Sequence, residues 1–553
     1  MFGCSRISIR AGLLALGLAL AAALPGAAAE EIFFKFGPLV RSIRVSSLEA
    51  LVQEGVIEDD LAFYIQVIGL SDAEVDQFRT AIARPVEVDG VLLSRFLYSA
   101  MGEDLLGRIG SVMRLRSGSN GERALRAALV NAALSEQGFS TISVIRHLPT
   151  NMQVNVADVQ AVARAVTQVV EATEASIAQL ATLTTTQALQ EPPVDYSTLP
   201  DLTQPGRLEV DIQRFNWVDD QRDRALSVDV VRPRSWRPGP APVMVFSHGL
   251  SADPASRHRW ASHLASHGIV VVLPQHPGSD SIHTANFRDG LRSDLFDSQD
   301  FIDRPLDISF VLDQLENLNA TAFDGRLDLG QVGVGGHSFG GYTALAVAGA
   351  TLDFDHLEAA CDRRFIHINV SLLLQCQALQ LPRQDYKFYD PRVAAIFLVN
   401  PVNSSVFSPD SLATLDSPVL VLAGSHDPAT PAVFEQLGTF NWFTTDSRSI
   451  GLIEGQAHVD LSALDAGLSN LIAGIPGLTL AEPDLVDRYL KALGLAFTER
   501  YVARRVDYRV FLRAAYAKHL SQTEPFRLLM INAGDAIEQD LITPLEQLPQ
   551  LLE

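Results

Sequence analysis

A serine between closely spaced glycines is the feature of this sequence that points most directly to chemistry. Ser338 stands in the run Gly336-His337-Ser338-Phe339-Gly340, which follows a short apolar stretch and precedes an apolar helical segment. A G-x-S-x-G pattern between a strand and a helix is typical of a sharp turn that exposes a nucleophilic hydroxyl. A side chain at Gly336 or Gly340 would collide with neighbouring backbone in such a turn. The pattern predicts a serine nucleophile at Ser338, with a glycine-rich packing turn as the alternative.

Two further residues stand where the partners of such a serine are needed. A serine hydroxyl needs a base to remove its proton and a carboxylate to orient that base, and the chain order serine, acid, histidine is one known arrangement. Asp427 follows the predicted strand 418–422, and His458 follows the predicted strand 450–453. We expect Asp427 to be the acid, although it would also suit the N-cap of the next helix. We expect His458 to be the base, with a surface histidine as the alternative and Asp460 as a rival acid.

A carbonyl oxygen under attack by the serine becomes negative, so two preorganised N–H donors are needed beside it. One is expected to be the backbone N–H of Phe339, directly after the nucleophile. The other is expected in the loop His248-Gly249-Leu250, which follows the predicted strand 242–247. Its position assigns the role to the N–H of Leu250. His248 is expected to fix the loop by hydrogen bonding rather than to transfer protons.

The elements that must position these residues are short apolar runs, separated by helical segments, from residue 206 onward. This alternation is the signature of a mostly parallel sheet with flanking helices. Active residues of such sheets gather at the carboxyl ends of the strands, where the candidates above stand. We predict strands at 242–247, 269–274, 331–335, 393–399, 418–422 and 450–453, an edge strand at 526–531 and additional helices within 486–520.

The sequence before residue 206 is of a different kind. A short hairpin is predicted from residues 32–36 and 42–45, and helices follow, one of them opened by a capping box at Ser71. A long amphipathic helix begins near Asp158, and four prolines among polar residues at 190–205 are typical of a linker. We therefore predict a mainly helical domain of unknown role at 30–189, a linker at 190–205 and an α/β domain at 206–553.

The N-terminus predicts a secretory signal peptide at residues 1–29. Arg6 and Arg10 precede an apolar run at 11–24, and small residues end at Ala29. The alternative is a membrane anchor, but this run is shorter than the ~20 residues that a spanning helix needs. We expect cleavage near Ala29, export to the periplasm or beyond the cell, and no transmembrane segment afterwards.

Two cysteines remain after the predicted signal peptide. Cys361 and Cys376 form an even pair in a chain sent to an oxidising compartment, which favours a disulfide over two buried thiols. Both lie in segment 351–391, which is longer than a simple crossover between a helix and a strand needs. We interpret this insertion as a candidate lid, with a packed excursion that gates nothing as the alternative.

Composition limits the remaining function classes. The chain has 553 residues, of which 47% are hydrophobic, so it can bury large cores, and disorder and collagen are excluded. Its net charge of −22 repels nucleic acids and anionic lipid surfaces. His263 and His267 have the spacing of a helical metal pair, but no Glu follows His263, so we expect helix-surface histidines, no metal and no cofactor. His276 is expected to line the substrate cleft.

At these residues the chain resembles the α/β-hydrolases. Within them it is similar to exported proteins described as predicted dienelactone hydrolases and to platelet-activating-factor acetylhydrolase-like esterases. The matching residues are His248-Gly249-Leu250, His276-Pro277-Gly278, Gly336 to Gly341, Asp427 and His458. Dienelactone hydrolases themselves use a cysteine where this chain has Ser338. The N-terminal region looks like an uncharacterised helical domain that accompanies such hydrolases, and that likeness implies no activity.

The prediction from the sequence is an exported serine hydrolase that cleaves acyl or lipid-type carboxylic esters through an acyl-enzyme, with Ser338, Asp427 and His458 as its triad. Its substrate is expected to be a small molecule or a lipid. Alternatives on the same fold are a phospholipase, a polyester hydrolase or a peptide hydrolase. An alternative of another class is a non-catalytic binding protein that retains a relic of the serine turn.

Overall fold

The computed structural model describes residues 28–362, 369–458 and 479–533, and these form two compact units. The first unit comprises the described residues up to Ser94 together with Leu106–Gln160. The second comprises Arg95–Leu105 and the described residues from Ala161 onward. Most of the predicted signal peptide and the rival acid Asp460 lie outside the described residues.

The first unit combines a small sheet with short helices. Its strands are β1 (Glu31–Phe36), β2 (Leu39–Arg44), β3 (Met113–Leu115) and β4 (Met152–Asn155), in the order β2-β1-β4-β3. The predicted hairpin is confirmed as β1 and β2, and the capping box at Ser71 is confirmed at the start of α4 (Asp72–Ala83). The parallel pairing of β4 with β1 was not predicted, because a four-residue strand gives little signal and its partner is far away in sequence. The helices are α2 (Val45–Glu54), α3 (Asp59–Ile68), α4, α7 (Glu122–Leu134) and α8 (Thr141–Arg146), with α5 (Gly90–Tyr98) and α6 (Ala100–Val112) shared between the units.

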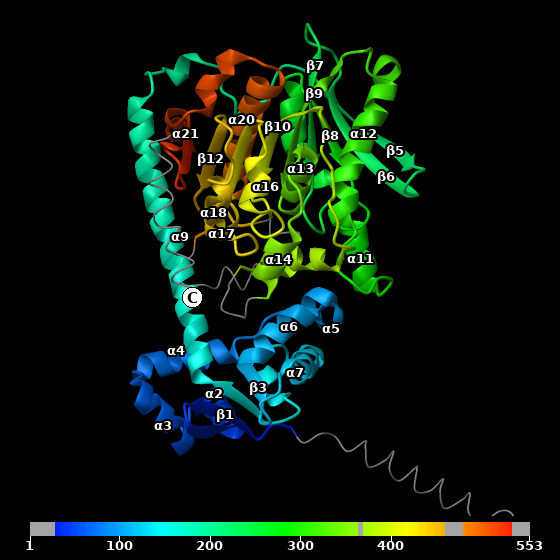
Figure 1. The fold of residues 1–553 in the computed structure, drawn as a ribbon. Coiled ribbons are helices and arrows are strands. Elements are labelled where there is room, and N and C mark those ends of the chain that lie inside the picture. The colour runs from blue at the N-terminus through cyan, green and yellow to red at the C-terminus, as the bar shows by residue number, and fades with distance from the viewer. Residues whose placement is uncertain (1–27, 363–368, 459–478, 534–553) are drawn as a thin grey trace, which may run out of the picture. The chain divides into compact units, whose positions relative to one another are not determined.

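A nine-stranded sheet dominates the second unit (Figure 1). The strands lie in the order β13-β12-β11-β10-β9-β7-β8-β6-β5. The six from β12 to β8 run parallel, whereas β13, β6 and β5 pair antiparallel with their neighbours. This topology confirms the predicted fold class, and β13 is the predicted edge strand. The bounds are β5 (Val210–Asp219), β6 (Arg224–Pro233), β7 (Ala241–Ser247), β8 (Val270–Pro274), β9 (Leu327–His337), β10 (Val393–Val399), β11 (Val419–Gly424), β12 (Arg448–Ile453) and β13 (Leu528–Asn532).

Helices cover both faces of this sheet, and the alternation of side chains along each strand explains how. Val245 belongs to a core shared with α12 (Asp300–Ala322) and α13 (Phe339–Ala348), whereas its neighbour Phe246 belongs to a core shared with α10 (His258–Ser266) and α20 (Pro483–Phe497). Successive residues of a strand point to opposite faces, so the central strands are apolar throughout. The remaining helices of this unit include α11 (Ser281–Asp289), α16 (Pro409–Ala413), α17 (Ala432–Glu435), α18 (Leu437–Phe440) and α21 (Ala514–Ser521).

The compact units divide near residue 160 rather than within the predicted linker. Helix α9 (Val156–Gln190) continues into the second unit, where the Thr184 hydroxyl accepts a hydrogen bond from the backbone N–H of Met530 at the edge strand β13. In the predicted linker, Leu202 is buried and the Tyr196 hydroxyl donates to the carbonyl of Val510. The prolines therefore mark irregular backbone that packs against the second unit, and the predicted domain boundaries stay predictions.

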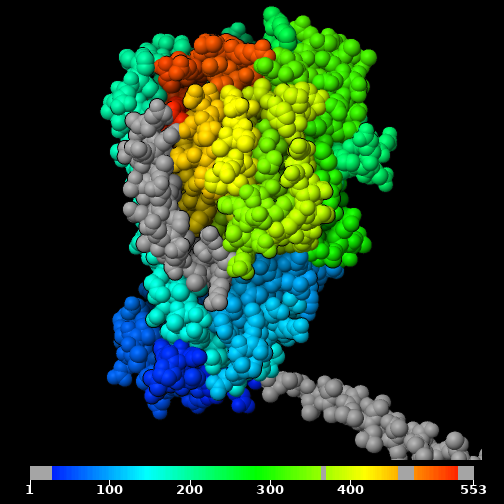
Figure 2. All heavy atoms as spheres, in the orientation of Figure 1, coloured from blue at the N-terminus to red at the C-terminus, as the bar shows by residue number. Residues whose placement is uncertain are grey.

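The insertion at 351–391 contains α14 (Phe354–Cys361), α15 (Leu372–Gln375) and the short helix η3 (Cys376–Gln380). The predicted disulfide is confirmed, since Cys361 and Cys376 are bonded. Leu357 and Leu374 join the main core, and the chain between α13 and β11 makes up much of the face seen in Figure 2. The described parts of the insertion are thus packed, and its gating role stays a prediction. Among the described residues, no helix is both long and apolar enough to cross a membrane.

Candidate active site

Ser338 occupies a sharp turn between β9 and α13. Its backbone has φ of 56° and ψ of −119°, a conformation that side-chain-bearing residues rarely adopt. A Cβ at Gly336 would collide with the backbone of Gly340, and a Cβ at Gly340 would collide with the carbonyl of Ser247. Both glycines are therefore required by close backbone approach, and the turn lifts the Ser338 hydroxyl to the carboxyl edge of the sheet.

The structure brings together the three residues singled out as nucleophile, acid and base. The Nε2 atom of His458 lies 2.8 Å from the Ser338 hydroxyl, and its Nδ1 atom lies 2.6 Å from Oδ2 of Asp427. They follow β9, β11 and β12, whose parallel directions bring their carboxyl ends to one edge. The His458 side chain is 10% exposed, so the imidazole is mostly enclosed but reachable. This arrangement lets a proton pass from the serine hydroxyl to the imidazole.

Two residues that sequence reasoning missed hold Asp427 in place. Its Oδ1 atom accepts the N–H groups of Ala429 and Thr430, each at 2.9 Å. Its Oδ2 atom accepts the Thr430 hydroxyl at 2.7 Å and the side-chain amide of Asn400. Asn400 follows β10, so the rule that finds strand ends could have found it. Together these bonds prevent the carboxylate from rotating away from His458.

His337, inside the serine motif, contacts His458 from the other side. Its Nε2–H donates to the carbonyl of His458 at 2.7 Å, and the two rings lie 4.8 Å apart. Burial, with a smaller effect of the charge on Arg257, lowers the pKa of His337 well below its ordinary value. A neutral ring is consistent with a fixed donor, so His337 positions the loop that carries the base.

The loop predicted to supply an oxyanion donor lies beside the turn. A Cβ at Gly249 would stand 3.3 Å from the Cβ of Ser338, which leaves little room for a side chain there. The Nε2 atom of His248 accepts the N–H of His276 at 3.1 Å, so its Nδ1–H donates to the carbonyl of Gly249 at 2.7 Å. Burial lowers the pKa of His248 well below its ordinary value, which agrees with the fixing role expected for it. The assignments of the Leu250 and Phe339 N–H groups as donors stay predictions.

Two other histidines differ from expectation. His276 is fully buried between the Ser247 hydroxyl and Asp307, so the expectation that it lines the cleft is wrong. His263 is also buried rather than at the helix surface, and burial lowers its pKa to about 4. His263 and His267 bond the carbonyls of Leu202 and Gln204, which fastens the predicted linker to α10. Within the described part of the chain, no group of three histidine, cysteine or carboxylate side chains is arranged to hold a metal ion.

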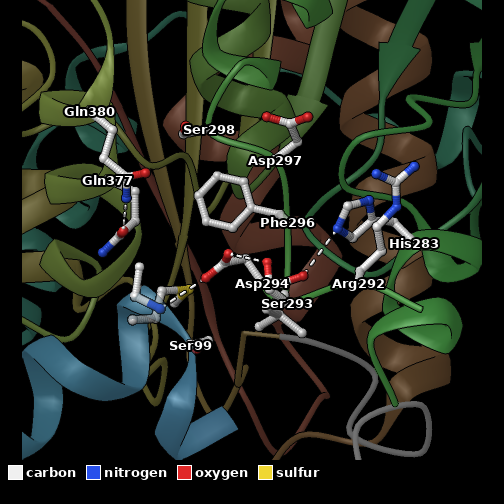
Figure 3. A pocket seen from close by; sticks show the side chains of 13 residues that line it. Ser99, His283, Arg292, Ser293, Asp294, Phe296, Asp297, Ser298, Gln377 and Gln380 are labelled. Carbon is white, nitrogen blue, oxygen red and sulfur yellow. Dashed lines mark hydrogen bonds between the residues drawn. The ribbon is translucent and has the colours of Figure 1, made fainter. Parts of the chain in front are cut away.

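Two cavities lie near this edge of the sheet. One, of about 240 Å³, is shown in Figure 3: Gln377 and Gln380 lie on one side, His283 and Arg292 on the other, and Phe296 between them. The Phe296 ring also packs edge-on against Phe339, with ring centroids 5.7 Å apart. The other cavity, of about 430 Å³, borders His337 and His458. Apolar side chains such as Trp260, Val399 and Leu490 share its lining with the charged residues Arg257, Arg259, Glu482 and Asp487.

Comparison with known families gives two matches on separate parts of the chain. Residues 28–155 match a family described as an alpha/beta hydrolase of unknown function, and residues 199–360 match the chlorophyllase family. The second match covers the strands from β5 to β9 and includes Ser338, while Asp427 and His458 lie beyond it. No curated protein matches the chain.

Proposed function

We propose that this chain, which has the α/β-hydrolase fold, is an exported serine esterase that cleaves carboxylic esters with Ser338, His458 and Asp427. The observation that carries the proposal is a continuous hydrogen-bonded path through the three side chains. The Ser338 hydroxyl lies 2.8 Å from Nε2 of His458, and Nδ1 of the same ring lies 2.6 Å from Oδ2 of Asp427. The strained backbone of Ser338 adds to it, because such strain is kept where function needs it.

In the first half of the proposed reaction, Oγ of Ser338 bonds to the ester carbonyl carbon while Nε2 of His458 takes the proton of that hydroxyl. The tetrahedral intermediate then expels the alcohol, which receives that proton from His458. An acyl group remains on Ser338. Asp427 holds the imidazole in the required tautomer and stabilises its positive charge.

In the second half, water repeats the attack on the acyl-enzyme. His458 takes a proton from the water as its oxygen bonds to the acyl carbon, and then returns the proton to Oγ of Ser338. The carboxylic acid leaves and the enzyme is regenerated. In both halves the N–H groups of Phe339 and Leu250 stabilise the negative oxygen, in the way that preorganised donors do.

The substrate class proposed is acyl or lipid-type esters. The match to the chlorophyllase family supports esters, since chlorophyllase is an esterase. The apolar side chains Trp260, Val399 and Leu490 in the cavity of about 430 Å³ beside His458 support a substrate with an apolar portion. Export is supported by the disulfide between Cys361 and Cys376, since such bonds persist in oxidising compartments.

Mass spectrometry after reaction with a fluorophosphonate, beside hydrolysis of p-nitrophenyl acetate, butyrate and octanoate, tests the proposal. We expect one adduct, on Ser338, and turnover that Ser338→Ala abolishes. Ser227→Ala is the control, because it removes a serine hydroxyl from β6 that bonds Asn216 in the same sheet. Turnover that survives Ser338→Ala would exclude this nucleophile. Absence of both adduct and turnover in the wild type would favour a binding protein.

A further inference from the structure

A cluster of buried and partly buried charges lies behind the loop that carries His248, Gly249 and Leu250. It is built from the hairpin of β5 and β6 and from the first turns of α12, which place charged side chains of both signs in contact; they are Arg222, Arg224, Asp300, Asp303, Arg304 and Asp307. Burying ions is costly unless their partners are well placed. We therefore expect the paired charges of this cluster to hold the side chains and the loop that they contact in one geometry.

Arg304 is the one of these arginines that is fully buried, and it is the one that reaches the loop. Its Nη1 atom donates to the carbonyl of His248 at 2.7 Å, and its Nε atom donates to the hydroxyl of Ser279 at 2.8 Å. Asp300 stands 3.6 Å from the same Nε atom. Burial lowers the pKa of Arg304 to about 10, so the guanidinium is still charged at neutral pH.

The same guanidinium also touches the residue that follows the nucleophile. Its central carbon lies 4.3 Å from the centroid of the Phe339 ring, a distance at which a cation is attracted to the ring face. The same ring also packs edge-on against Phe301, with ring centroids 4.8 Å apart. Arg304 is therefore in contact with both segments that the proposed oxyanion hole needs, the loop after β7 and the start of α13.

Hydrogen bonds hold the loop on either side of Leu250. The backbone N–H of Ser251 donates to the carbonyl of Ser279 at 2.8 Å, and the carbonyl of His248 accepts from Arg304. Within residues 28–362, 369–458 and 479–533, the N–H of Leu250 donates to no backbone carbonyl. Ser279 joins the two anchors, since it contacts the loop through its carbonyl and Arg304 through its hydroxyl.

We propose that Arg304 is a positioning residue for the oxyanion hole, setting the separation between the N–H groups of Leu250 and Phe339. This inference rests on the proposed function. A planar guanidinium donates in two directions and stacks on a ring at the same time, which the ammonium group of lysine cannot reproduce. Arg304 thus acts on the reaction through the two donors and not by touching the substrate.

The test compares Arg304→Lys and Arg304→Met with the wild type, using kcat and KM for p-nitrophenyl butyrate and the inhibition constant of an alkyl trifluoromethyl ketone. The ketone carbon bonds to Oγ of Ser338, the serine proton passes to His458, and the ketone oxygen becomes an oxyanion. We expect kcat to fall about 10- to 100-fold with KM nearly unchanged, since deleting one donor outright costs about 10²- to 10³-fold. The inhibition constant should rise in parallel with the loss of kcat/KM.

Rates are normalised to the sites that a fluorophosphonate labels, so that loss of folded protein is not read as loss of catalysis. Arg392→Lys is the matched control. Arg392 is paired with Asp313, which lies on the same helix as Arg304, but it makes no contact with the loop that carries Leu250. Unchanged kcat and inhibitor affinity in Arg304→Lys, in an active wild type, would overturn this inference alone. A wild type with neither turnover nor labelling would overturn the proposed function with it.

If neither Arg304 variant folds, Ser279→Ala carries the test. It removes the hydroxyl that accepts from Arg304 and leaves the guanidinium in place. We expect kcat per labelled site to fall about 3- to 10-fold, a fraction of the loss from removing a donor. An unchanged kcat would contradict the positioning role.

Discussion

Two sets of serine, histidine and aspartate side chains in the second unit are connected in the same way. In one, His458 bonds Ser338 at 2.8 Å and Asp427 at 2.6 Å. In the other, Nε2 of His276 lies 3.0 Å from the Ser247 hydroxyl and its Nδ1 atom lies 2.9 Å from Asp307. The catalytic interpretation applies to the first set alone, so hydrogen-bond connectivity does not by itself identify a triad.

Three physical differences separate the sets. Ser247, His276 and Asp307 are all fully buried, whereas the His458 side chain is 10% exposed. Ser247 ends a regular strand, whereas Ser338 stands in a strained turn. Asp307 is shared with the guanidinium groups of Arg222 and Arg224, while no arginine contacts Asp427 in the part of the chain that the structure describes. Access, backbone strain and an acid without an arginine partner are the features that favour Ser338 over Ser247 as the nucleophile.

The largest difference between the two sets is expected when their aspartates are changed, and the larger loss of kcat is expected at Asp427. Asp427→Asn keeps the size of the side chain but cannot hold His458 in the tautomer that accepts the serine proton. We expect kcat for p-nitrophenyl butyrate to fall about 10³- to 10⁴-fold with little change in KM or in stability. Asp416→Asn, which alters an exposed aspartate beyond the opposite end of β11, should leave kcat unchanged. A loss of less than tenfold in Asp427→Asn would assign the acid to another carboxylate.

At Asp307 the equivalent change should act on folding instead. Asp307→Asn removes the charge that Arg222 contacts at 2.8 Å and Arg224 at 2.9 Å, in a site without exposure to water. Breaking a buried ion pair costs about 3 kcal/mol or more of unfolding free energy. Urea unfolding measures this loss, and kcat per labelled site should stay within about tenfold of the wild type because the change lies behind the loop. A far larger loss of kcat at unchanged stability would give the buried set a chemical role.

The catalytic candidates could be predicted because each carries a local signal. Ser338 sits in a recognisable motif, and Asp427 and His458 come within a few residues of strands whose apolar runs are plain in the sequence. The sheet was predicted for the same reason, as were the edge strand and the disulfide. These features depend on neighbours in sequence and on one rule about where parallel strands end.

The supporting residues could not be predicted, because their partners are distant in the chain. Arg304 and Asp307 lie inside α12 with no motif around them, and Arg224 contacts Asp307 from the hairpin of β5 and β6, which the sequence does not mark with apolar runs. Exposed and partly buried residues alternate along β5, so its sequence contains no continuous apolar run. His276 was misjudged for the same reason, since its strand end faces a buried charge cluster rather than the cleft. The location of the compact-unit boundary within α9 also depends on distant contacts.

The smallest effect, and the sharpest check on the comparison, is expected at Ser247. Burial and then the charges of Arg304, Arg224 and Arg222 lower the pKa of His276 well below its ordinary value. A histidine with a lowered pKa stays neutral as the pH falls through the ordinary range, so the buried set adds no titrating group to the acid limb of the pH profile. Ser247→Ala should therefore keep the midpoint of that limb in kcat/KM within about 0.2 pH units, and kcat within about threefold.

Fluorophosphonate labelling completes this check, because Ser247 is fully enclosed whereas Ser338 keeps 7% of its surface exposed. The wild type and Ser247→Ala should each take up one equivalent, whereas Ser338→Ala should take up none. A second equivalent on Ser247, or an acid limb that moves when its hydroxyl is removed, would mean that the buried histidine exchanges protons during turnover. Burial would then no longer suffice to explain why the set around Ser247 is silent.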